Sequence, residues 1–353
     1  MNKLFNVHIP NNIEGELINI LYSGQLTSGK NVRLFEDEVK NYINAPYFLA
    51  VNSYNSASSI VWELIGLKFG DEVIASPMSC LASNQPIAMK GGTLVWTDID
   101  PYRGSLDPDK VRKNITSKTK AILHYHWGGY LGHIDEIIKI GNEYGIPVVQ
   151  DGIESFGSDY QGSKFGAQNA DFTLFSFQPV RLPTTIDGGG IVFKRKEDND
   201  KAMLLRDYGV DRSKFRDELG EISEKCDISI PAMGAALNEI NAFIGYKSMA
   251  EISKLIELQR VNALKNLEYI NNLNKDIEHI DKTNTIPNYW IFSFLAKKRQ
   301  EVLNFLRNEG ILASKVHLRN DFYTVFGQFN KELKGVEKFN NEILSIPCGW
   351  WLN

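Results

Sequence analysis

The sequence predicts an α/β fold: a large domain with a mostly parallel central sheet, and a smaller carboxyl-terminal α+β domain. Over the first part of the chain, short and fully apolar segments alternate with helical ones, which is typical of parallel sheets covered on both faces. From about Asp227 the pattern changes to long helices and then to a short α+β stretch. With 353 residues, 43% hydrophobic and 23% charged, the chain can form two such domains. We place them at residues 1–240 and 241–353.

The predicted elements follow one another regularly. Apolar residues recur at helical spacing over 32–43, Tyr47–Val51 is a short apolar run, and 58–67 is again helical. The strand-turn-helix unit then recurs, with strands over 71–76, 93–99, 121–126 and 147–151 and helices near Ser83–Met89 and over Ile134–Tyr144. In such sheets ligands bind beyond the carboxyl ends of the strands, where Asp151, His124 and the turn 52–57 fall.

The carboxyl-terminal part has a different pattern of predicted elements. Helices are predicted over 235–245 and over Met249–Leu273, followed by an edge strand at 289–296. A further helix over 299–311 ends at Gly310, a residue favoured at helix ends. The charged segment Asp211–Cys226 is predicted to be a surface loop.

Composition excludes several functions. The net charge of −4 argues against nucleic acid or an anionic membrane as partner. No apolar run approaches the length of a membrane span, and no basic segment precedes an apolar one at the start, so we expect neither span nor signal peptide. The three cysteines are far apart, which indicates reduced thiols in the cytoplasm and no metal site.

The most informative motif lies at Asp171–Gly190, which reads D-F-T-L-F-S-F-Q-P-V-R-L-P-T-T-I-D-G-G-G, with V-V-Q-D-G-I-E-S-F-G around Asp151 upstream. This pairing resembles the sugar-aminotransferase family (DegT/DnrJ/StrS type), whose fold type I enzymes use pyridoxal phosphate (PLP). In that family the segment runs F-S-F-x-x-x-K-x-L-T-T-x-D-G-G, and its lysine holds PLP as a Schiff base. Here the matching residue is Arg181. A guanidinium, with a pKa above about 12, can neither form an imine nor shuttle a proton at neutral pH.

The resemblance extends over nearly the whole chain and implies a cofactor site. It makes Asp151 the partner of the pyridine nitrogen, which keeps the ring protonated as an electron sink. It places the stretch V-N-S-Y-N-S-A-S-S at a helix start whose amides cradle the phosphate. Alone, Asp151 would be a helix cap and Ser176 a satisfied strand serine, while Gly188–Gly190 would serve a close backbone approach or a plain turn. The implied cofactor-binding residues are Asn55, Ser56, Cys80 over the ring, Asp151, Glu154 and Ser176 on the phosphate.

Several positions depart from the family pattern. Tyr54 stands where the family has a glycine in the phosphate cradle, which brings a large side chain close to the phosphate. Glu154 replaces a common His or Gln and is electrostatically unhelpful unless Arg181 neutralises it. Gly234 and Ala236 stand where polar residues usually reach the partner's site. Together these departures favour natural divergence over a single engineered change at position 181.

Histidines are the candidates to replace the lysine. Some relatives carry a histidine at that position and act with pyridoxamine phosphate (PMP). Here His124, His126 and His317 are candidate general bases, with Arg181 at the lysine position, although each histidine also has a purely structural interpretation. Arg181 itself is suited to clamp a phosphate, a carboxylate or Glu154. His317 and Arg319 are the candidate substrate-binding residues.

Two functions remain open. In the first, the protein binds PMP or PLP noncovalently and acts on a keto-sugar nucleotide in surface-glycan or secondary-metabolite biosynthesis. In the second, it is a catalytically degenerate or rewired member that binds a sugar nucleotide or an active paralogue. Relatives build each site from two chains, so we expect a homodimer with the site at the interface. The orientation of Tyr54 separates the two functions, because a ring pointing into the cleft excludes the phosphate.

Overall fold

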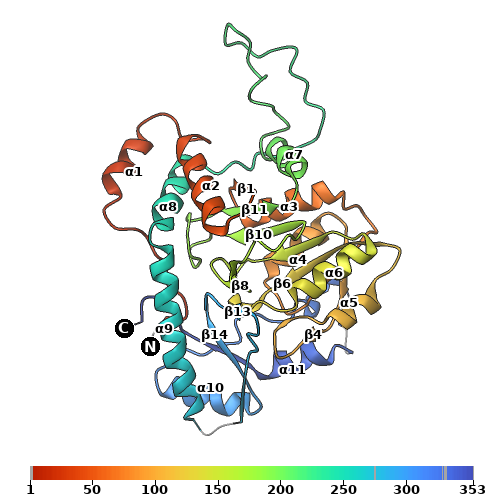
Figure 1. Ribbon diagram of the computed structural model, residues 1–353, viewed down its shortest axis with the longest axis vertical. Helices are drawn as coiled ribbons and strands as arrows, with labels where there is room; N and C mark the ends of the chain where they lie inside the picture. The colour runs from red at the N-terminus through yellow and green to blue at the C-terminus, as the bar shows by residue number, and fades with distance from the viewer. Residues whose placement is uncertain (1–2, 274–275, 328, 330–331, 353) are drawn as a thin grey trace.

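A seven-stranded sheet lies at the centre of the computed structural model, which describes residues 3–273, 276–327, 329 and 332–352 (Figure 1). Its strand order is β1-β11-β10-β7-β6-β2-β3. Strand β11 is antiparallel to both neighbours, β1 and β10, and the other neighbouring pairs are parallel. The mostly parallel α/β fold is therefore confirmed. The strands are β1 (Tyr47–Val51), β2 (Glu72–Ala75), β3 (Thr93–Trp96), β6 (Thr119–Tyr125), β7 (Val148–Asp151), β10 (Phe172–Ser176) and β11 (Gly189–Phe193).

Helices cover both faces of this sheet, because alternate strand residues point to opposite sides. Leu123 and Val149 pack into the core beneath α3 (Tyr54–Ile65) and α4 (Leu81–Met89), whereas Ile122 belongs to the core on the other face. That second face is covered by α5 (Pro108–Asn114) and α6 (Ile134–Tyr144), with α2 (Lys30–Ile43) further along it. Helix α7 (Lys196–Arg206) lies beside α3 (Figure 1). The predicted helix Ile134–Tyr144 has the predicted bounds.

The carboxyl-terminal part contains a second sheet of three strands, in the order β12-β14-β15. Strand β14 (Phe292–Ala296) is central in it, so the predicted edge strand at this position was wrong. All five of its residues are buried, as a central strand requires. The neighbouring elements are α8 (Glu239–Met249), α9 (Ile252–Asn271), β12 (Ile277–His279), α10 (Arg299–Asn308), α11 (Lys334–Glu342) and β15 (Ile343–Ile346). The boundary between residues 240 and 241 stays a prediction.

Short elements connect the two parts. Strand β13 pairs with β8, so the later part of the chain adds a strand to a small sheet formed by the earlier part. The two chain ends lie side by side (Figure 1). The short elements are α1 (Glu14–Leu21), β4 (Ile99–Asp100), β5 (Ser105–Leu106), β8 (Asp159–Tyr160), β9 (Ser163–Lys164), β13 (Thr285–Ile286) and 3-10 turns at Trp127–Gly129, Asn320–Phe322 and Thr324–Phe326.

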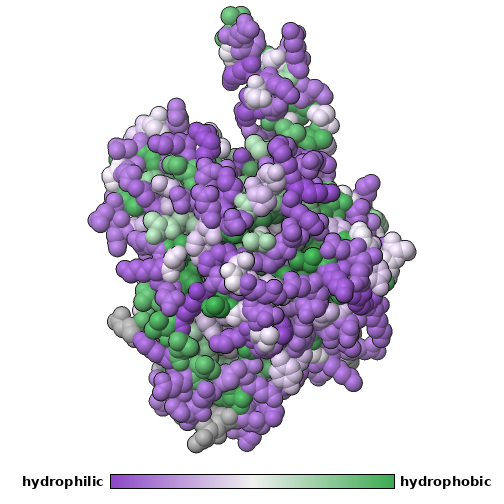
Figure 2. Space-filling model, viewed as in Figure 1, coloured by the Kyte–Doolittle hydropathy of each residue, from purple (hydrophilic) through white to green (hydrophobic). Residues whose placement is uncertain are grey.

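The segment Asp211–Cys226 leaves the body as an extended hairpin beyond α7 (Figure 1). Arg216 and Ile222 pair across it, and most of its residues are exposed, in agreement with the predicted surface loop. The face in Figure 2 is mainly polar, with this hairpin standing clear of it. Within the described part of the chain, no helix combines the length and the apolarity that crossing a membrane requires.

Candidate functional site

The carboxyl edge of the central sheet brings together five residues singled out in the sequence. Tyr54 begins α3 directly after β1, Cys80 precedes α4 after β2, and Asp151 ends β7. Glu154 and Arg181 follow on the loops after β7 and β10. Burial raises the pKa of Cys80 to about 11, and the charges of Glu154, Arg181 and Asp151 also act on it, so these groups share one site.

Glu154 is the most heavily bonded group of the site. Its Oε1 accepts from His317 Nε2 at 2.7 Å, and its Oε2 accepts from Tyr125 Oη at 2.7 Å and from the Gly128 amide at 2.8 Å. Burial acts to raise the pKa of this carboxyl, but His317, Arg181 and the Tyr125 hydroxyl outweigh it, so the pKa is lowered. Glu154 is therefore a buried carboxylate with its charge compensated.

Arg181 is held by that carboxylate and by an aromatic ring. Its Nη2 lies 3.7 Å from Glu154 Oε1, and its guanidinium carbon lies 4.0 Å from the centre of the Trp290 ring. The side chain is only 6% exposed, and its Nε and Nη1 have no hydrogen-bond partner among the described residues. The predicted neutralisation of Glu154 by Arg181 agrees with this geometry. A guanidinium packed in this way presents no nucleophilic amine to a ligand.

Asp151 and Tyr54 face each other at the base of the site. Asp151 is 0% exposed and Tyr54 is 1% exposed. Burial raises the pKa of Asp151 to about 6, although the hydroxyls of Ser83 and Tyr54 act to lower it. Burial and the nearby Asp151 raise the pKa of Tyr54 well above its ordinary value. The Tyr54 ring therefore points into the site.

The helix start predicted as a phosphate cradle has its own cap. Ser53 Oγ accepts from the Ser56 amide at 3.1 Å, and Ser56 Oγ donates to Asn52 Oδ1 at 2.7 Å. Asn55 is exposed. Ser176 is buried and its Oγ accepts from the Gln178 amide at 3.4 Å, so its environment fits the structural interpretation.

The three glycines after Asp187 serve a close backbone approach within the chain. A methyl group on Gly189 would lie 2.5 Å from the Ser53 carbonyl oxygen and 2.8 Å from the Tyr54 amide nitrogen. Strand β11 can pass this close to the start of α3 only without a side chain. The contact fixes the backbone from which Tyr54 projects.

His124 and His126 lie on the opposite face of the sheet from Asp151. Tyr125 is in register with Asp151, whereas His124 is in register with Gln150, and neighbours in register share a face. His126 Nε2 lies 2.6 Å from Gln150 Oε1. Burial lowers the pKa of both histidines, that of His126 to about 4. The structure therefore brings neither His124 nor His126 to the site.

The two predicted substrate-binding residues are in different situations. His317 reaches the site and bonds to Glu154. Arg319 is buried and forms a two-bond ion pair with Asp321, at 2.8 and 2.6 Å, against the rings of Phe322 and Phe329. Arg319 thus stabilises the loop after His317.

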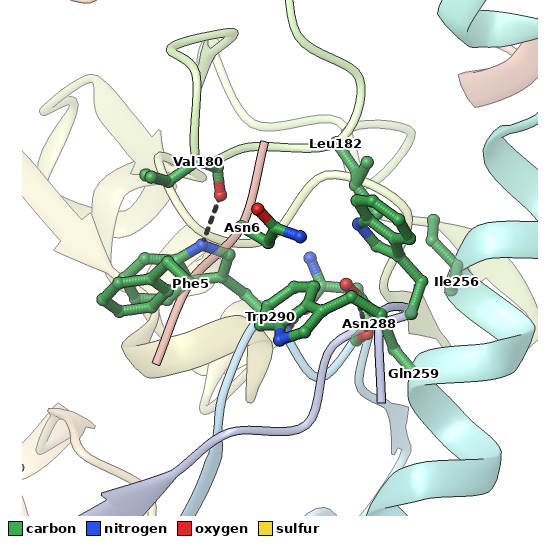
Figure 3. Close-up of a pocket in the computed structure, with 10 residues that line it drawn as sticks. Phe5, Asn6, Val180, Leu182, Ile256, Gln259, Asn288 and Trp290 are labelled. Atoms are coloured by element: carbon green, nitrogen blue, oxygen red, sulfur yellow. Dashed lines mark hydrogen bonds between the residues drawn. The ribbon is translucent and has the colours of Figure 1, made fainter. Parts of the chain in front are cut away.

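The chain ends close the mouth of the site. Phe5 stacks on Trp290 with ring centres 4.5 Å apart and an angle of 14° between the planes (Figure 3). Arg181 packs against the same side chain, with its guanidinium carbon 4.0 Å from the centre of the Trp290 ring. The indole nitrogen of Trp290 donates to the Val180 carbonyl at 2.8 Å, the dashed line in Figure 3. A cavity of about 10 Å³ remains there, lined among others by Asn6, Gln259, Trp350 and Trp351.

These residues do not fit a pyridoxal coenzyme as they stand. The pyridine nitrogen would need hydrogen-bonding distance from Asp151, yet Asp151 borders no space of the size of a water molecule. Its Oδ2 has no hydrogen-bond partner among the described residues, and the Tyr54 hydroxyl acts to lower the pKa of the same carboxyl. Protein side chains therefore fill the space beside Asp151 that the ring of the coenzyme would need.

Sequence reasoning missed Trp290, Tyr125 and Phe5. Tyr125 is in register with Asp151, so the alternation of the predicted strand 121–126 was a signal for it. Trp290 and Phe5 meet across 285 residues of sequence, and no local pattern predicts that contact.

Comparison with known proteins agrees with this fold. The model of the DegT/DnrJ/EryC1/StrS aminotransferase family matches residues 8–353. The UDP-4-amino-4,6-dideoxy-N-acetyl-beta-L-altrosamine transaminase of Campylobacter jejuni is 26% identical over 338 residues, which cover 93% of this chain and 87% of that protein. The uncharacterized protein MJ1066 of Methanocaldococcus jannaschii is 30% identical over 241 residues, 68% of this chain. The match spans 62% of that relative's own length.

A solved structure gives the same result for the fold. The sugar aminotransferase CalS13 from Micromonospora echinospora superposes with a TM-score of 0.92 at 24% identity, over 100% of this chain and 96% of that one. The likeness extends through both sheets. The chain belongs to the DegT/DnrJ/EryC1/StrS aminotransferase family.

Proposed function

We propose that this protein recognises a nucleotide sugar without transferring an amino group through a lysine-bound coenzyme. The observation that carries the proposal is the burial of Arg181 beside Trp290 and Glu154, at the position that we infer from the sequence motif to be that of the Schiff-base lysine. Imine formation needs a neutral amine, and a guanidinium stays protonated at any physiological pH.

The remaining polar groups support a binding role rather than proton transfer. Glu154 is saturated by His317, Tyr125 and Gly128, and its lowered pKa keeps it ionised. His317, the histidine that reaches the site, is engaged by Glu154. A carboxylate bonded to one ring nitrogen of a histidine leaves the other free to take a proton, so it is the buried Tyr54 beside Asp151 that speaks against PMP chemistry here. The noncovalent PMP hypothesis therefore has less support than the catalytically degenerate one.

The proposed ligand follows from the family. The relative from Campylobacter jejuni is named for a UDP-linked amino sugar. The cavity beside Trp290, Trp350 and Trp351 has a volume of only about 10 Å³, so a nucleotide sugar that bound there would displace the segment around Phe5. We place the protein in the cytoplasm, in surface-glycan or secondary-metabolite biosynthesis, where nucleotide sugars are consumed.

Two measurements on the purified protein test the proposal. Calorimetry with a UDP-sugar and a dTDP-sugar, against free UMP and free sugar, is expected to show saturable binding of one nucleotide sugar. After addition of PLP, absorbance spectra should show no internal-aldimine band, and borohydride should leave no coenzyme on the chain. A lysine adduct, amino transfer to a keto sugar, or lack of binding to every nucleotide sugar tried would overturn the proposal.

We also propose that two copies associate. Exposed apolar residues gather on α1, at Ile18, Leu21 and Tyr22, and on the hairpin, where Leu219 is 88% exposed and Ile222 is also exposed. Single chains rarely expose such groups together, so a chain-chain contact explains them. A homodimer is expected by light scattering, and elution as a monomer at micromolar concentration would contradict it.

A further inference from the structure

We propose that the Tyr54 phenol occupies the place of the coenzyme ring beside Asp151, and that Tyr54 alone excludes PLP and PMP whatever residue stands at position 181. The inference rests on the proposed function in taking the site as one without coenzyme chemistry. It goes further by naming the side chain that closes the site and by separating it from the lost lysine.

The position of Tyr54 is fixed by the backbone. It is the first residue of α3, directly after the N-cap Ser53, and the helix start is pinned against Gly189 of β11. Its ring packs into the large core with Val51 and Ala57, and it is 1% exposed. The ring therefore has no route to solvent while α3 stays in place.

Three buried polar atoms converge at the end of this ring. Tyr54 Oη, Ser83 Oγ and Asp151 Oδ2 each lack a hydrogen-bond partner within 3.5 Å among the described residues. They nevertheless lie close enough for the two hydroxyls to act on the pKa of Asp151, and for Asp151 to act on that of Tyr54. Buried polar atoms are nearly always paired in native proteins, so a small rearrangement that joins the phenol to the carboxyl is favourable.

A phenol and a pyridinium are similar in shape. Both are flat six-membered rings that present a single proton donor at one edge, and Asp151 accepts from either. They differ in charge, because the phenol is neutral whereas the pyridinium is a cation. The neutral Tyr54 hydroxyl acts to lower the pKa of Asp151, but burial outweighs it, so the pKa stays raised, at about 6. The Tyr54 phenol thus has the shape of the coenzyme ring without its charge.

Arg181 contributes nothing to this exclusion. Its guanidinium packs on Trp290, and its Nη2 lies 3.7 Å from Glu154 Oε1. Exchanging Arg181 for lysine therefore leaves the Tyr54 ring over Asp151. Exchanging Tyr54 for glycine removes the ring and leaves the Asp151 carboxyl facing an empty space of similar shape.

Four proteins decide the question: wild type, Tyr54→Gly, Arg181→Lys and the double variant. The probes are PMP and PLP, and binding is measured by equilibrium dialysis and coenzyme absorbance. Wild type and Arg181→Lys are expected to show no saturable binding. Tyr54→Gly is expected to bind PMP at least about tenfold more tightly than wild type. The double variant should also yield, after PLP and borohydride, a peptide with coenzyme on the residue at position 181.

Tyr144→Gly is the matched control. It makes the same Tyr-to-Gly exchange at the end of α6, but Tyr144 is 50% exposed and lies on the other face of the sheet from Asp151. This variant should behave as wild type. Near-ultraviolet circular dichroism shows whether Tyr54→Gly folds, with Tyr54→Ala as a less disruptive substitute.

Each outcome has a definite meaning. Saturable PMP binding by wild type or by Arg181→Lys overturns the inference, even if neither Tyr54 variant folds. A folded Tyr54→Gly that binds neither coenzyme overturns it too. These results leave the proposed function intact, since that fails only on a lysine adduct, amino transfer or the absence of nucleotide-sugar binding.

Discussion

Arg181 Nη2 lies 3.7 Å from Glu154 Oε1, and both side chains are buried. The distance is too long for a hydrogen bond but short enough for strong attraction where water is absent. His317 Nε2, at 2.7 Å, supplies the direct hydrogen bond to the same oxygen. Glu154 is therefore the counter-charge of the buried Arg181 cation, and the two side chains are best understood together.

Removing this counter-charge should destabilise the fold. Glu154→Gln keeps the shape of the side chain but leaves Arg181 and His317 without a carboxylate, and a broken buried pair costs about 3 kcal/mol. Urea unfolding is the measurement. Glu143→Gln, on the exposed pair with Arg112, is the control and should leave the midpoint unchanged. Equal midpoints for Glu154→Gln and wild type would show that the network is not stabilising.

The pKa of Asp151 predicts a pH dependence of stability. Its folded-state pKa is raised from 3.8 to about 6, so between these values the folded protein binds more protons than the unfolded chain. Stability from this group is present below pH 4 and falls as the pH rises towards 6, by on the order of 3 kcal/mol. The Asp151→Asn variant has no titrating carboxyl at this position, so it does not lose this stability as the pH rises. Its stability relative to wild type should rise between pH 4.5 and pH 7.5 in urea unfolding.

A constant difference between these two proteins across the range would refute that assignment. The two proteins differ at this one carboxyl, so the comparison isolates its contribution from those of residues that both proteins share.

The stack of Phe5 on Trp290 predicts that the amino-terminal segment covers the mouth. Phe5→Ala should lower stability by about 1–2 kcal/mol and increase acrylamide quenching of tryptophan fluorescence, because one face of Trp290 becomes uncovered. Val7→Ala is the control in the same segment, since Val7 is exposed. Unchanged quenching in Phe5→Ala would mean that the segment does not shield Trp290 in solution.

The histidines on the far face of the sheet give opposite expectations. Both ring nitrogens of His124 are buried without a partner, so His124→Leu should stabilise the protein by about 1 kcal/mol. His126→Leu should destabilise it by about 2 kcal/mol, because it leaves Gln150 Oε1 unpaired. Urea unfolding of both variants is the check. Nucleotide-sugar binding by each should equal that of wild type, and a loss of binding would place these residues at the site after all.

Much of the fold was predictable because short stretches of sequence determine the individual helices and strands. The helix Ile134–Tyr144 and the strand Tyr47–Val51 were predicted with the bounds they have, since each carries a clear period between turn residues. The strand around Phe292 was placed at an edge, although its continuous apolar run is that of a central strand. The site was predictable where a motif fixed it, as at Asp151, Glu154 and Arg181.

The parts of the site that could not be predicted depend on the direction in which side chains point rather than on their position along the chain. His124 and His126 fall at the correct strand end but point away from Asp151, and only the register between β6 and β7 shows this. The inward orientation of Tyr54 follows from the contact between Gly189 and the start of α3, which joins segments more than 130 residues apart. Such contacts are tertiary, and a one-dimensional pattern does not contain them.

The neighbouring chain ends have a practical consequence. Phe5 and Trp350 line the same small cavity, so both termini emerge over the entrance to the pocket. An affinity tag fused to either terminus sits beside that entrance and competes with any incoming molecule, so tag-free protein is the right material for ligand screens. The same proximity makes the chain a natural candidate for circular permutation, with a short linker joining the old ends and new ends opened in the exposed hairpin.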